Sequence, residues 1–331
     1  MFEKSLFRFV AVLAALMLLI GTAQADVIIE TVPVGYPGNA PDDNGYGTVD
    51  ELYLIGKYEV TAGQYTEFLN AVADTDSYGL YNTNMTSYYG CKIARSGSSG
   101  SYSYTVAPDR ENRPVNYVSW GDAARFANWL HNGQPTGAQG NGTTEDGAYV
   151  LNGAMSQSTL MAIMRQSDAT WFLPTENEWY KAAYHKNDGI AGNYFDYPTA
   201  SDAVPSNGLI DPDPGNNANF FQNGYTIGGP YWTTEVGEFE NSASPYGTFD
   251  QGGNLWEWNE SVYTAGLSRG LRGGDWYYDS AYPRATFRSN NNPPYENAYI
   301  GFRVASVPEP GSIALLVFGL ITGLVWWRCK R

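Results

Sequence analysis

Short helical segments separated by long stretches rich in glycine, proline, asparagine and serine dominate this 331-residue sequence. Three segments begin with a capping box, in which a Ser or Thr side chain and the residue three positions later each satisfy a backbone N–H group. They start at Thr61, Ser119 and Thr175, and each continues for about ten residues with apolar side chains at helical spacing. This pattern predicts a single α+β domain with few short strands and helices and much irregular loop.

The strands that the sequence predicts are brief, at residues 27–34, 52–60, 232–239 and 300–305. Three stretches resemble linkers in composition, but capped helices and aromatic clusters lie on both sides of each, so we expect surface loops of one domain. These stretches are 95–104, 133–147 and 211–219. Five tryptophans are expected in the core of that domain: Trp120, Trp129, Trp179, Trp256 and Trp258.

Residues 1–25 have the order of parts of a secretory signal peptide. Lys4 and Arg8 precede the apolar run FVAVLAALMLLIG, and the small residues AQA stand directly before Asp26. The apolar run is short for a membrane span of about 20 residues. A removable signal peptide is therefore the expectation, and a retained membrane anchor is the alternative.

The C-terminal residues 307–331 resemble the PEP-CTERM sorting signal of exported Gram-negative bacterial proteins. Pro308, Glu309 and Pro310 precede an apolar segment at 312–327, and the chain ends on basic residues. The resemblance implies a transmembrane segment, processing by an exosortase-type peptidase, and delivery to the cell surface, the envelope or the extracellular matrix. It also implies a setting of exopolysaccharide and biofilm systems.

The full chain carries a formal net charge of −15 at pH 7. Residues 1–25 contribute +1 and residues 310–331 contribute +3, which leaves −19 for the segment between them. A charge of that sign argues against nucleic acid as a partner, because binding to nucleic acid needs a cationic surface. It leaves carboxylates available for hard cations such as Ca²⁺.

The sequence contains two cysteines, Cys91 and Cys329. Cys329 lies in the C-terminal segment that sorting would remove, so the mature domain has no second cysteine with which to form an internal disulfide. The fold must therefore be held together by burial, to which a composition with 15% aromatic residues is suited.

Six segments occur in the order found in the sulfatase-modifying-factor superfamily, whose founding member is the formylglycine-generating enzyme. They are IGKYEVTAGQYTEFLNAV, RPVNYVSWGDAARFANWL, FLPTENEWYKAAY, GNLWEWNES, LRGGDWYYDS and GFRVA. The sequence resembles this family over residues 26–306, which is nearly the whole chain between its two end segments. The resemblance implies a single formylglycine-generating-enzyme-like domain related to the C-type-lectin-like fold.

A structural calcium ion is a second implication of the resemblance. In the family, the stretch that matches FDQGGNLWEW holds Ca²⁺ through two side chains and two backbone carbonyl groups. The implied metal ligands in this sequence are Asp250, Gly253, Leu255 and Glu257. Such a mixture of carboxylate and carbonyl oxygens suits a hard cation. The alternative is an acidic turn in which Glu257 forms a salt bridge.

The copper site of the family is not expected here. Formylglycine generation uses two cysteines that bind copper, and the resemblance aligns their positions with Tyr278 and Pro283. Neither residue can replace a soft thiolate ligand, so we expect neither copper nor this oxidase activity. An iron site would need His131 and His185, the only two histidines, to converge, and both lie in segments typical of exposed helix ends.

The segment 272–306 combines aromatic rings with planar guanidinium groups. Side chains of these types can recognise peptides, or sugars that bear acidic groups. The candidate ligand-binding residues are Arg272, Trp276, Tyr278, Tyr282, Arg284 and Arg288. The alternative is that the rings fill the core and the arginines pair with buried acids.

Taken together, these features predict an exported, surface-sorted member of the family that has no catalytic residues and recognises a polysaccharide or a peptide. One alternative is a metal-dependent oxidoreductase of the same superfamily with a non-standard site. Another is a structural surface protein without a specific ligand. Because fold alone does not establish function, the metal requirement is the discriminating observation: an oxidase needs stoichiometric copper or iron, whereas a recognition module binds at most Ca²⁺.

Overall fold

The capping boxes that the sequence predicts begin the three longest helices of the computed structural model, which describes residues 26–308. These helices are α2 (Ala62–Val72), α3 (Trp120–His131) and α5 (Glu176–Tyr184). In each helix, the Ser or Thr at the N-cap accepts a hydrogen bond from the third helical residue, whose side chain accepts one from the N-cap N–H group. Local hydrogen bonding therefore fixes where these helices begin.

Several shorter elements accompany these helices. The helix α4 (Gln157–Met161) also begins with a capping box, and two 3₁₀ helices are η1 (Thr83–Thr86) and η2 (Pro108–Arg110). The strands β3 (Ile93–Ser96) and β4 (Ser103–Val106) form an antiparallel hairpin. The linker-like stretch 95–104 is thus part of a folded hairpin within the domain.

One four-stranded sheet joins the two ends of the described chain. Its strands lie in the order β1 (Thr31–Val34), β2 (Tyr53–Gly56), β10 (Ala305–Ser306) and β5 (Trp171–Phe172), and all neighbours are antiparallel. Ile55 in β2 pairs with Val32 on one side and Ala305 on the other. The beginning and the end of the domain are therefore held in one sheet.

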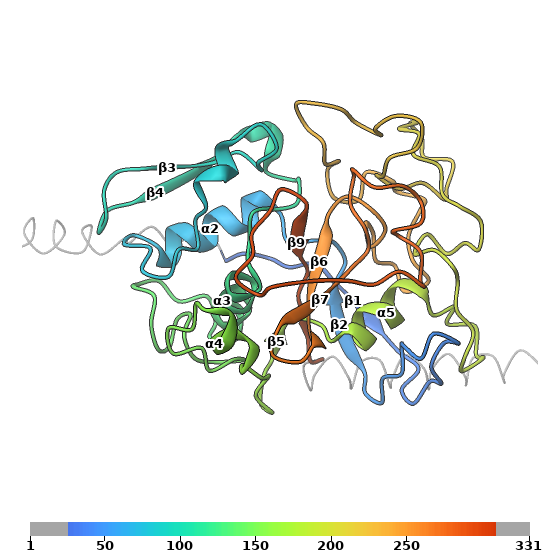
Figure 1. Ribbon diagram of the computed structural model, residues 1–331, viewed down its shortest axis with the longest axis horizontal. Helices are drawn as coiled ribbons and strands as arrows, with labels where there is room; N and C mark the ends of the chain where they lie inside the picture. The colour runs from blue at the N-terminus through green and yellow to red at the C-terminus, as the bar shows by residue number, and fades with distance from the viewer. Residues whose placement is uncertain (1–25, 309–331) are drawn as a thin grey trace, which may run out of the picture.

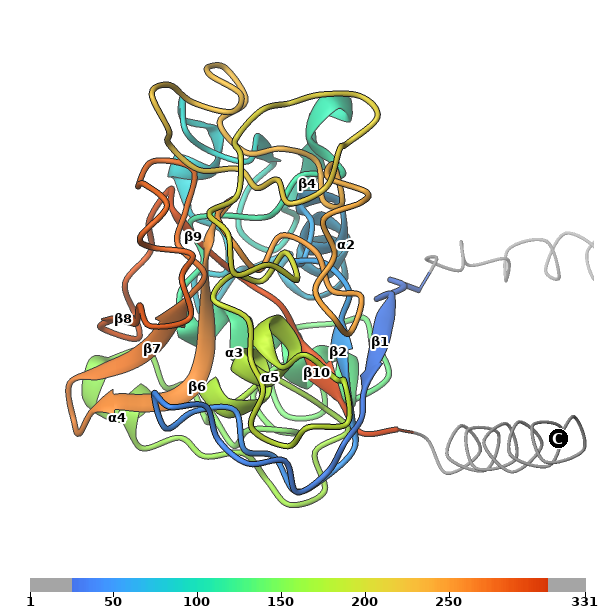
Figure 2. The ribbon, with the colours of Figure 1, turned by 90° about the vertical axis from the view of Figure 1, so that its right-hand side faces the viewer.

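A second four-stranded sheet supports the C-terminal half of the chain. Its strands lie in the order β8 (Ser289–Asn291), β7 (Ser268–Arg272), β6 (Trp256–Thr264) and β9 (Ile300–Phe302), and only β6 and β9 run parallel. Figure 2 shows long loops gathered at the end of the molecule that lies opposite the turn between β6 and β7.

The core lies between these sheets and the helices. Figure 1 shows α2 and α3 on one side of the central strands and α5 on the other. The five tryptophans expected in the core are all buried, with exposed fractions of 5% or less. Within the core, Phe68 of α2 packs against Phe126 and Trp129 of α3, with ring centroids 5.3 and 5.2 Å apart. The expected α+β class, with few short helices and strands and much loop, is confirmed.

The predicted strand at 232–239 is absent, because the backbone there does not form a ladder. Trp232 has a φ of +66°, which lies outside the extended region of a strand. Its neighbours bond to loops, since Val236 N donates to Asn112 O over 2.8 Å and Gly237 N donates to Asp250 Oδ2 over 2.6 Å. The residues of this segment that favour strands, namely Trp, Thr, Val and Phe, therefore gave a misleading strand signal.

The predicted signal peptide at 1–25 and the predicted transmembrane segment at 312–327 lie outside the described residues. Of the sorting-signal residues, Pro308 is described, whereas Glu309 and Pro310 are not. Within residues 26–308, no helix has the length and apolar character needed to cross a membrane.

Candidate functional site

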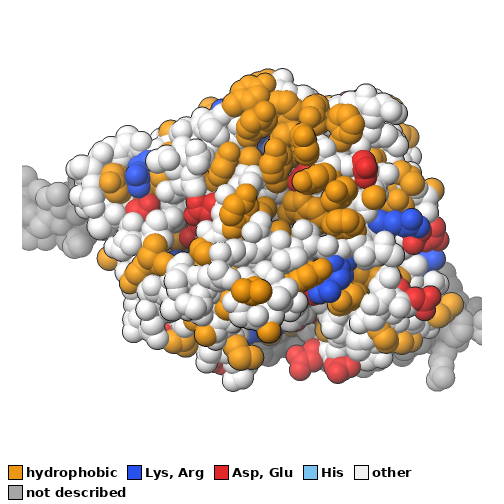
Figure 3. Space-filling view, in the orientation of Figure 1, with side chains coloured by type: hydrophobic (Ala, Val, Ile, Leu, Met, Phe, Trp, Pro, Cys, Tyr) orange, Lys and Arg blue, Asp and Glu red, His pale blue; other side chains and the backbone are white. Residues whose placement is uncertain are grey.

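A contiguous group of partly exposed aromatic side chains covers one face of the domain, where Figure 3 shows hydrophobic side chains gathered. Tyr88 is 56% exposed, Tyr277 is 48% exposed, and their neighbours Tyr89 and Tyr278 are 42% and 40% exposed. We call this group the aromatic patch, and its members are Tyr88, Tyr89, Phe221, Tyr225, Trp232, Trp276, Tyr277, Tyr278 and Tyr299. Soluble proteins seldom expose large connected apolar patches without a function.

Trp276 is the centre of the aromatic patch, although only 2% of its surface is exposed. Its ring contacts five others at centroid distances of 4.7–5.9 Å: Tyr89, Tyr225, Trp232, Tyr277 and Tyr299. These rings come from four segments of the chain that are distant in sequence. The buried indole therefore fixes the relative positions of the exposed rings around it.

A buried carboxyl group holds the loop that carries Trp276, Tyr277 and Tyr278. Asp275 Oδ1 accepts hydrogen bonds from the backbone N–H groups of Tyr277 and Tyr278, at 2.7 and 3.2 Å. Burial raises the pKa of Asp275 to about 7, and these two N–H groups act in the opposite direction. Phe221 N also donates to Tyr278 O over 2.9 Å, which ties a second patch segment to this loop. Hydrogen bonds thus fix the backbone of the residues that carry these exposed rings.

Three of the residues predicted to bind a ligand are found together. Trp276 and Tyr278 belong to the aromatic patch, and Tyr282 stacks on Tyr278 with ring centroids 4.3 Å apart. Tyr282 in turn packs against Phe287 and Trp256, at 4.4 and 6.0 Å. Tyr282 therefore supports the patch from the side of the core.

The three predicted arginines do not face the patch as free donors. Arg272 is fully buried, with Nε donating to Glu176 Oε1 over 2.7 Å, so its expected place at a ligand surface is corrected. Arg288 donates to both oxygens of Glu176 at 2.6 Å, and Arg284 pairs with Asp196 at 2.7 Å on the surface. The first residue of α5 thus binds two of the arginines and joins that helix to β7 and the following loop.

Most members of the aromatic patch were not predicted from the sequence. Tyr88 and Tyr89 follow η1, and Phe221, Tyr225 and Trp232 lie in long loops between α5 and β6. Only the fold brings these segments beside Trp276. The available signal was the presence of large aromatic residues in the glycine-rich contexts SYYG and FFQNGY, where no helical or strand period assigns them to the core.

The two predicted carboxylate ligands for calcium both accept hydrogen bonds from other groups of the protein. Glu257 is fully buried, and Arg303 donates to both of its oxygens at 2.6 Å while Trp179 Nε1 donates to Oε2 at 2.7 Å. Asp250 accepts from Gly237 N, and Leu255 is buried. Residues 26–308 contain no group of three or more His, Cys, Asp or Glu placed to hold a metal ion. The donors around Glu257 fit a buried ion pair, which was the alternative interpretation.

Two further carboxyl groups lie near this ion pair. Burial, together with the carboxylates of Asp250 and Glu257, raises the pKa of Glu59 well above its usual value. Burial also raises the pKa of Asp250 to about 6. Glu59 Oε2 accepts from Asn254 Nδ2 over 3.0 Å, whereas Oε1 is buried without a hydrogen-bond partner among the described residues. Repulsion between close carboxylates therefore favours protonation of Glu59.

The two positions that the resemblance aligns with the copper-binding cysteines carry no thiol group. Tyr278 is part of the aromatic patch, and the buried Pro283 accepts a hydrogen bond at its carbonyl from Tyr184, over 3.0 Å. Cys91 is a free, buried thiol whose backbone N donates to Asn116 Oδ1 over 2.9 Å. Burial raises the pKa of the Cys91 thiol, which disfavours the thiolate that a soft metal would need.

The two histidines do not converge on a metal site. His131 Nδ1 lies 2.9 Å from Thr170 Oγ1 near the surface. His185 was expected at an exposed helix end but is fully buried, with Nδ1 2.8 Å from Tyr246 Oη. Burial lowers the pKa of His185, so its imidazole is held neutral inside the protein. The aromatic residues Tyr36, Tyr194 and Tyr246 surround its ring.

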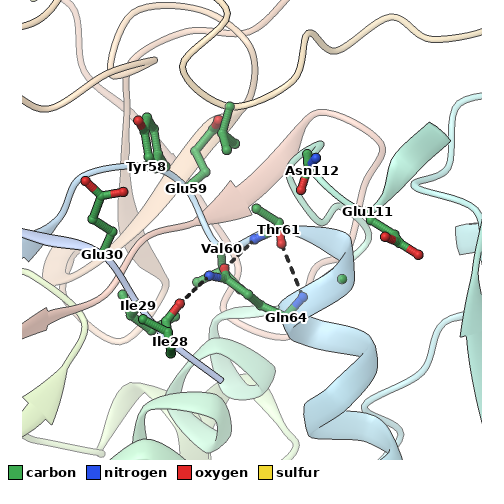
Figure 4. Close-up of a pocket in the computed structure, with 12 residues that line it drawn as sticks. Ile28, Ile29, Glu30, Tyr58, Glu59, Val60, Thr61, Gln64, Glu111 and Asn112 are labelled. Carbon is green, nitrogen blue, oxygen red and sulfur yellow. Dashed lines mark hydrogen bonds between the residues drawn. The ribbon is translucent and has the colours of Figure 1, made fainter. Parts of the chain in front are cut away.

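A separate groove of about 440 Å³ lies beside the start of α2, and Figure 4 shows the residues that line it. Gln64 spans this groove, since its Nε2 donates to Ile28 O and its Oε1 accepts from Thr61 N, both over 2.9 Å. Glu30 on its rim pairs with Lys57 at 2.7 Å. Gln64 and Glu30 are thus engaged within the protein, and we assign no ligand to the groove.

Comparison with known proteins gives a family match over most of the chain. The family described as "Sulfatase-modifying factor enzyme 1-like domain" matches residues 40–307. The "Inactive C-alpha-formylglycine-generating enzyme 2" of Bos taurus is 33% identical over 147 residues, which cover 40% of this chain and 43% of the relative. The chain thus spans less than half the length of this mammalian relative. The "Formylglycine-generating enzyme" of Thermomonospora curvata is 23% identical over 82% of this chain and 89% of its own.

Solved structures agree at the level of the fold. CarF superposes with a TM-score of 0.54 and 21% identity, covering 86% of this chain and all of its own. Treponema denticola variable protein 1 superposes with a TM-score of 0.50 and 19% identity, covering 86% of this chain and 98% of its own. At these identities the similarity concerns the arrangement of the backbone and leaves the ligand open.

Proposed function

Because the chain belongs to the sulfatase-modifying factor enzyme 1-like domain family, we propose that it is a recognition module of that family that binds a polysaccharide or a peptide through the aromatic patch. The observation that carries the proposal is the connection of partly exposed rings around the buried Trp276. Ligand sites are commonly built from loops on a rigid scaffold, with large aromatic rings and few charges.

The single cysteine of the described domain supports the further proposal that the protein does not generate formylglycine. The described domain contains the single cysteine Cys91, which is buried and whose backbone N–H donates a hydrogen bond to Asn116. A single buried thiol cannot supply the two thiolates that hold copper in the family's oxidase. The bovine relative is itself described as inactive, which agrees with this part of the proposal.

We also propose export and surface sorting, on the basis of the two end segments of the sequence. Residues 1–25 support secretion by their basic start, apolar run and AQA end, and residues 307–331 support PEP-CTERM sorting by an exosortase-type peptidase. This placement would expose the aromatic patch to extracellular polysaccharides and surface proteins. We propose no role for calcium in recognition itself, since none of the predicted calcium ligands belongs to the aromatic patch.

The proposal is tested with the full chain purified from the exported fraction. We expect no conversion of cysteine to formylglycine in a sulfatase-derived test peptide, with or without added Cu(I), and binding on either a glycan array or a peptide-display library. Tyr225→Ala should abolish that binding while the melting temperature shows that the domain remains folded. Turnover of the test peptide would contradict the non-catalytic part, and an absence of hits on both platforms would overturn recognition by the patch.

A further inference from the structure

We infer that the ligand of the aromatic patch is an uncharged polysaccharide, bound by stacking of its sugar rings on the exposed tyrosines. This inference rests on the proposed recognition function and narrows it to one class of ligand. A neutral sugar ring has an apolar face of C–H groups and a rim of hydroxyl groups. A matching surface therefore needs flat rings, hydrogen-bonding groups at their edges, and no charge that must be neutralised.

The rings of the patch have this form. Tyr277 meets Trp276 and Tyr278 edge to face, at interplanar angles of 90° and 85°, so neighbouring rings present faces in different directions. Tyr88 and Tyr89 are similarly perpendicular, at 75°. The exposed tyrosines therefore offer several separate faces along a connected surface, which suits a chain of sugar rings better than a single flat ligand.

The hydroxyl groups of the patch are available to a ligand. Buried tyrosines elsewhere in the domain donate to carbonyl oxygens, as Tyr65 does to Leu80 and Tyr104 does to Ala73, at 2.9 and 2.8 Å. The hydroxyl groups of Tyr88, Tyr277 and Tyr278 make no hydrogen bond to any other residue between 26 and 308. These phenols can donate to and accept from sugar hydroxyl groups at no cost to the fold.

Three cations close in sequence or contact to patch residues donate hydrogen bonds to backbone carbonyl groups. Lys92 Nζ donates to Ser87 O over 2.5 Å, and Arg110 Nη2 donates to Pro230 O over 2.8 Å. Arg113 donates to the carbonyl groups of Asp109 and Thr233. Arg110 and Arg113 are buried, so an acidic sugar at the patch would lose water around its carboxylate without reaching these guanidinium groups, which is unfavourable.

The net charge of the chain also disfavours acidic ligands. At −15 it repels polyanions over the distance of a Debye length, which disfavours acidic polysaccharides before contact is made. The arginines that could have bound acidic groups are paired instead, with Glu176 and Asp196. The charges therefore select against the anionic ligands that the sequence had left open.

A peptide fits the patch less well. Extended peptides commonly bind by adding a strand to an exposed sheet edge, which supplies backbone hydrogen bonds. The patch residues lie in turns and loops, and none of the nine is part of a strand. The patch therefore offers rings and phenols, whereas a bound peptide backbone would leave many of its N–H and C=O groups without partners from this surface.

Affinity electrophoresis of the full exported chain tests this inference. The gels contain a neutral polysaccharide (dextran, galactomannan, xyloglucan or β-glucan) or an acidic one (alginate or polygalacturonate), each in low and in high salt. We expect retardation by at least one neutral polymer, unchanged by salt, and none by the acidic polymers. Tyr88→Ala and Tyr277→Ala should each weaken binding by about tenfold or more, as expected for residues at the centre of a binding site.

Tyr263→Ala is the matched control, because Tyr263 is 37% exposed on β6 and contacts Arg288 rather than the patch. Its retardation should equal that of the wild type, and the melting temperatures should show that all three variants are folded. Binding only to acidic polymers, or only to members of a peptide-display library, would overturn the neutral-polysaccharide inference and leave the recognition function standing. A failure to bind any polysaccharide or peptide would overturn both.

Discussion

Glu257 lies in the interior of the domain, where its carboxylate accepts three hydrogen bonds. Two come from Arg303, whose remaining N–H groups donate to the carbonyl groups of Gly56, Lys57 and Phe249. A buried ion pair with this many hydrogen bonds compensates for the loss of water around both charges. Removing one partner leaves the other charge buried and uncompensated.

Glu257→Gln should therefore lower the free energy of unfolding by about 3–5 kcal/mol, the usual cost of breaking a buried pair. Because the cost arises from Arg303, we expect the same loss in calcium and in chelator, measured by urea unfolding. Glu30→Gln is the control, since its exposed pair with Lys57 should contribute at most about 1 kcal/mol. A loss confined to calcium would instead support Glu257 as a calcium ligand.

At the scale of elements, the loop 292–299 is joined to α3 and η1 by a pair of acidic groups. Glu296 accepts a hydrogen bond from Asn82, the N-cap of η1, and lies close to Asp122 in the first turn of α3. Burial and the Asp122 carboxylate raise the pKa of Glu296 to about 8, and burial raises the pKa of Asp122 as well. The folded domain thus takes up a proton that the unfolded chain releases near the usual value of 4.5.

The sign of the resulting pH dependence follows from that uptake. Between about pH 4.5 and 8 the folded state binds more protons, so the free energy of unfolding should fall as the pH rises. Glu296→Gln should flatten this slope by up to about 1.4 kcal/mol per pH unit. Urea unfolding at several pH values measures it, with the exposed Glu51→Gln as the control. A slope that Glu296→Gln leaves unchanged would contradict the uptake of a proton by Glu296 on folding.

The elements also show what the sequence could and could not predict. Helix starts at Thr61, Ser119 and Thr175 were correct because a capping box is a local interaction within four residues. The pair β6–β7 was missed, since its buried Glu257 and Arg272 conceal the apolar pattern of a strand. Their burial depends on partners about 50 to 100 positions away, which no local period reports.

The candidate site, too, was predicted in part and missed in part. Trp276, Tyr278 and Tyr282 were predicted together because they are neighbours in sequence. Tyr88 and Tyr225 were missed, since only the packing of distant loops against Trp276 brings them to the patch. The predicted arginines were assigned to the ligand because their acidic partners lie far away in the sequence and could not be identified before the fold was known.

At the scale of the whole molecule, the net charge lowers the stability of the folded domain and burial raises it. With a net charge of −15, the like charges of the folded protein repel one another and lower its stability. The described domain also has no disulfide, because Cys91 is its single cysteine. Stability thus depends on the aromatic core and on buried ion pairs. Added salt screens the repulsion between surface carboxylates and should leave the buried pairs almost unaffected.

The melting temperature of the exported chain should therefore rise with NaCl, and reducing agent should have no effect on it. At equal ionic strength, CaCl₂ and MgCl₂ separate general screening from a specific site, because a site with carboxylate and carbonyl ligands in flexible geometry prefers Ca²⁺ to Mg²⁺. With Glu257 paired to Arg303, we expect equal effects of the two divalent ions. A larger rise in Ca²⁺ that disappears in Asp250→Asn would show that calcium displaces this pairing, and the ion-pair interpretation of the turn would then be wrong.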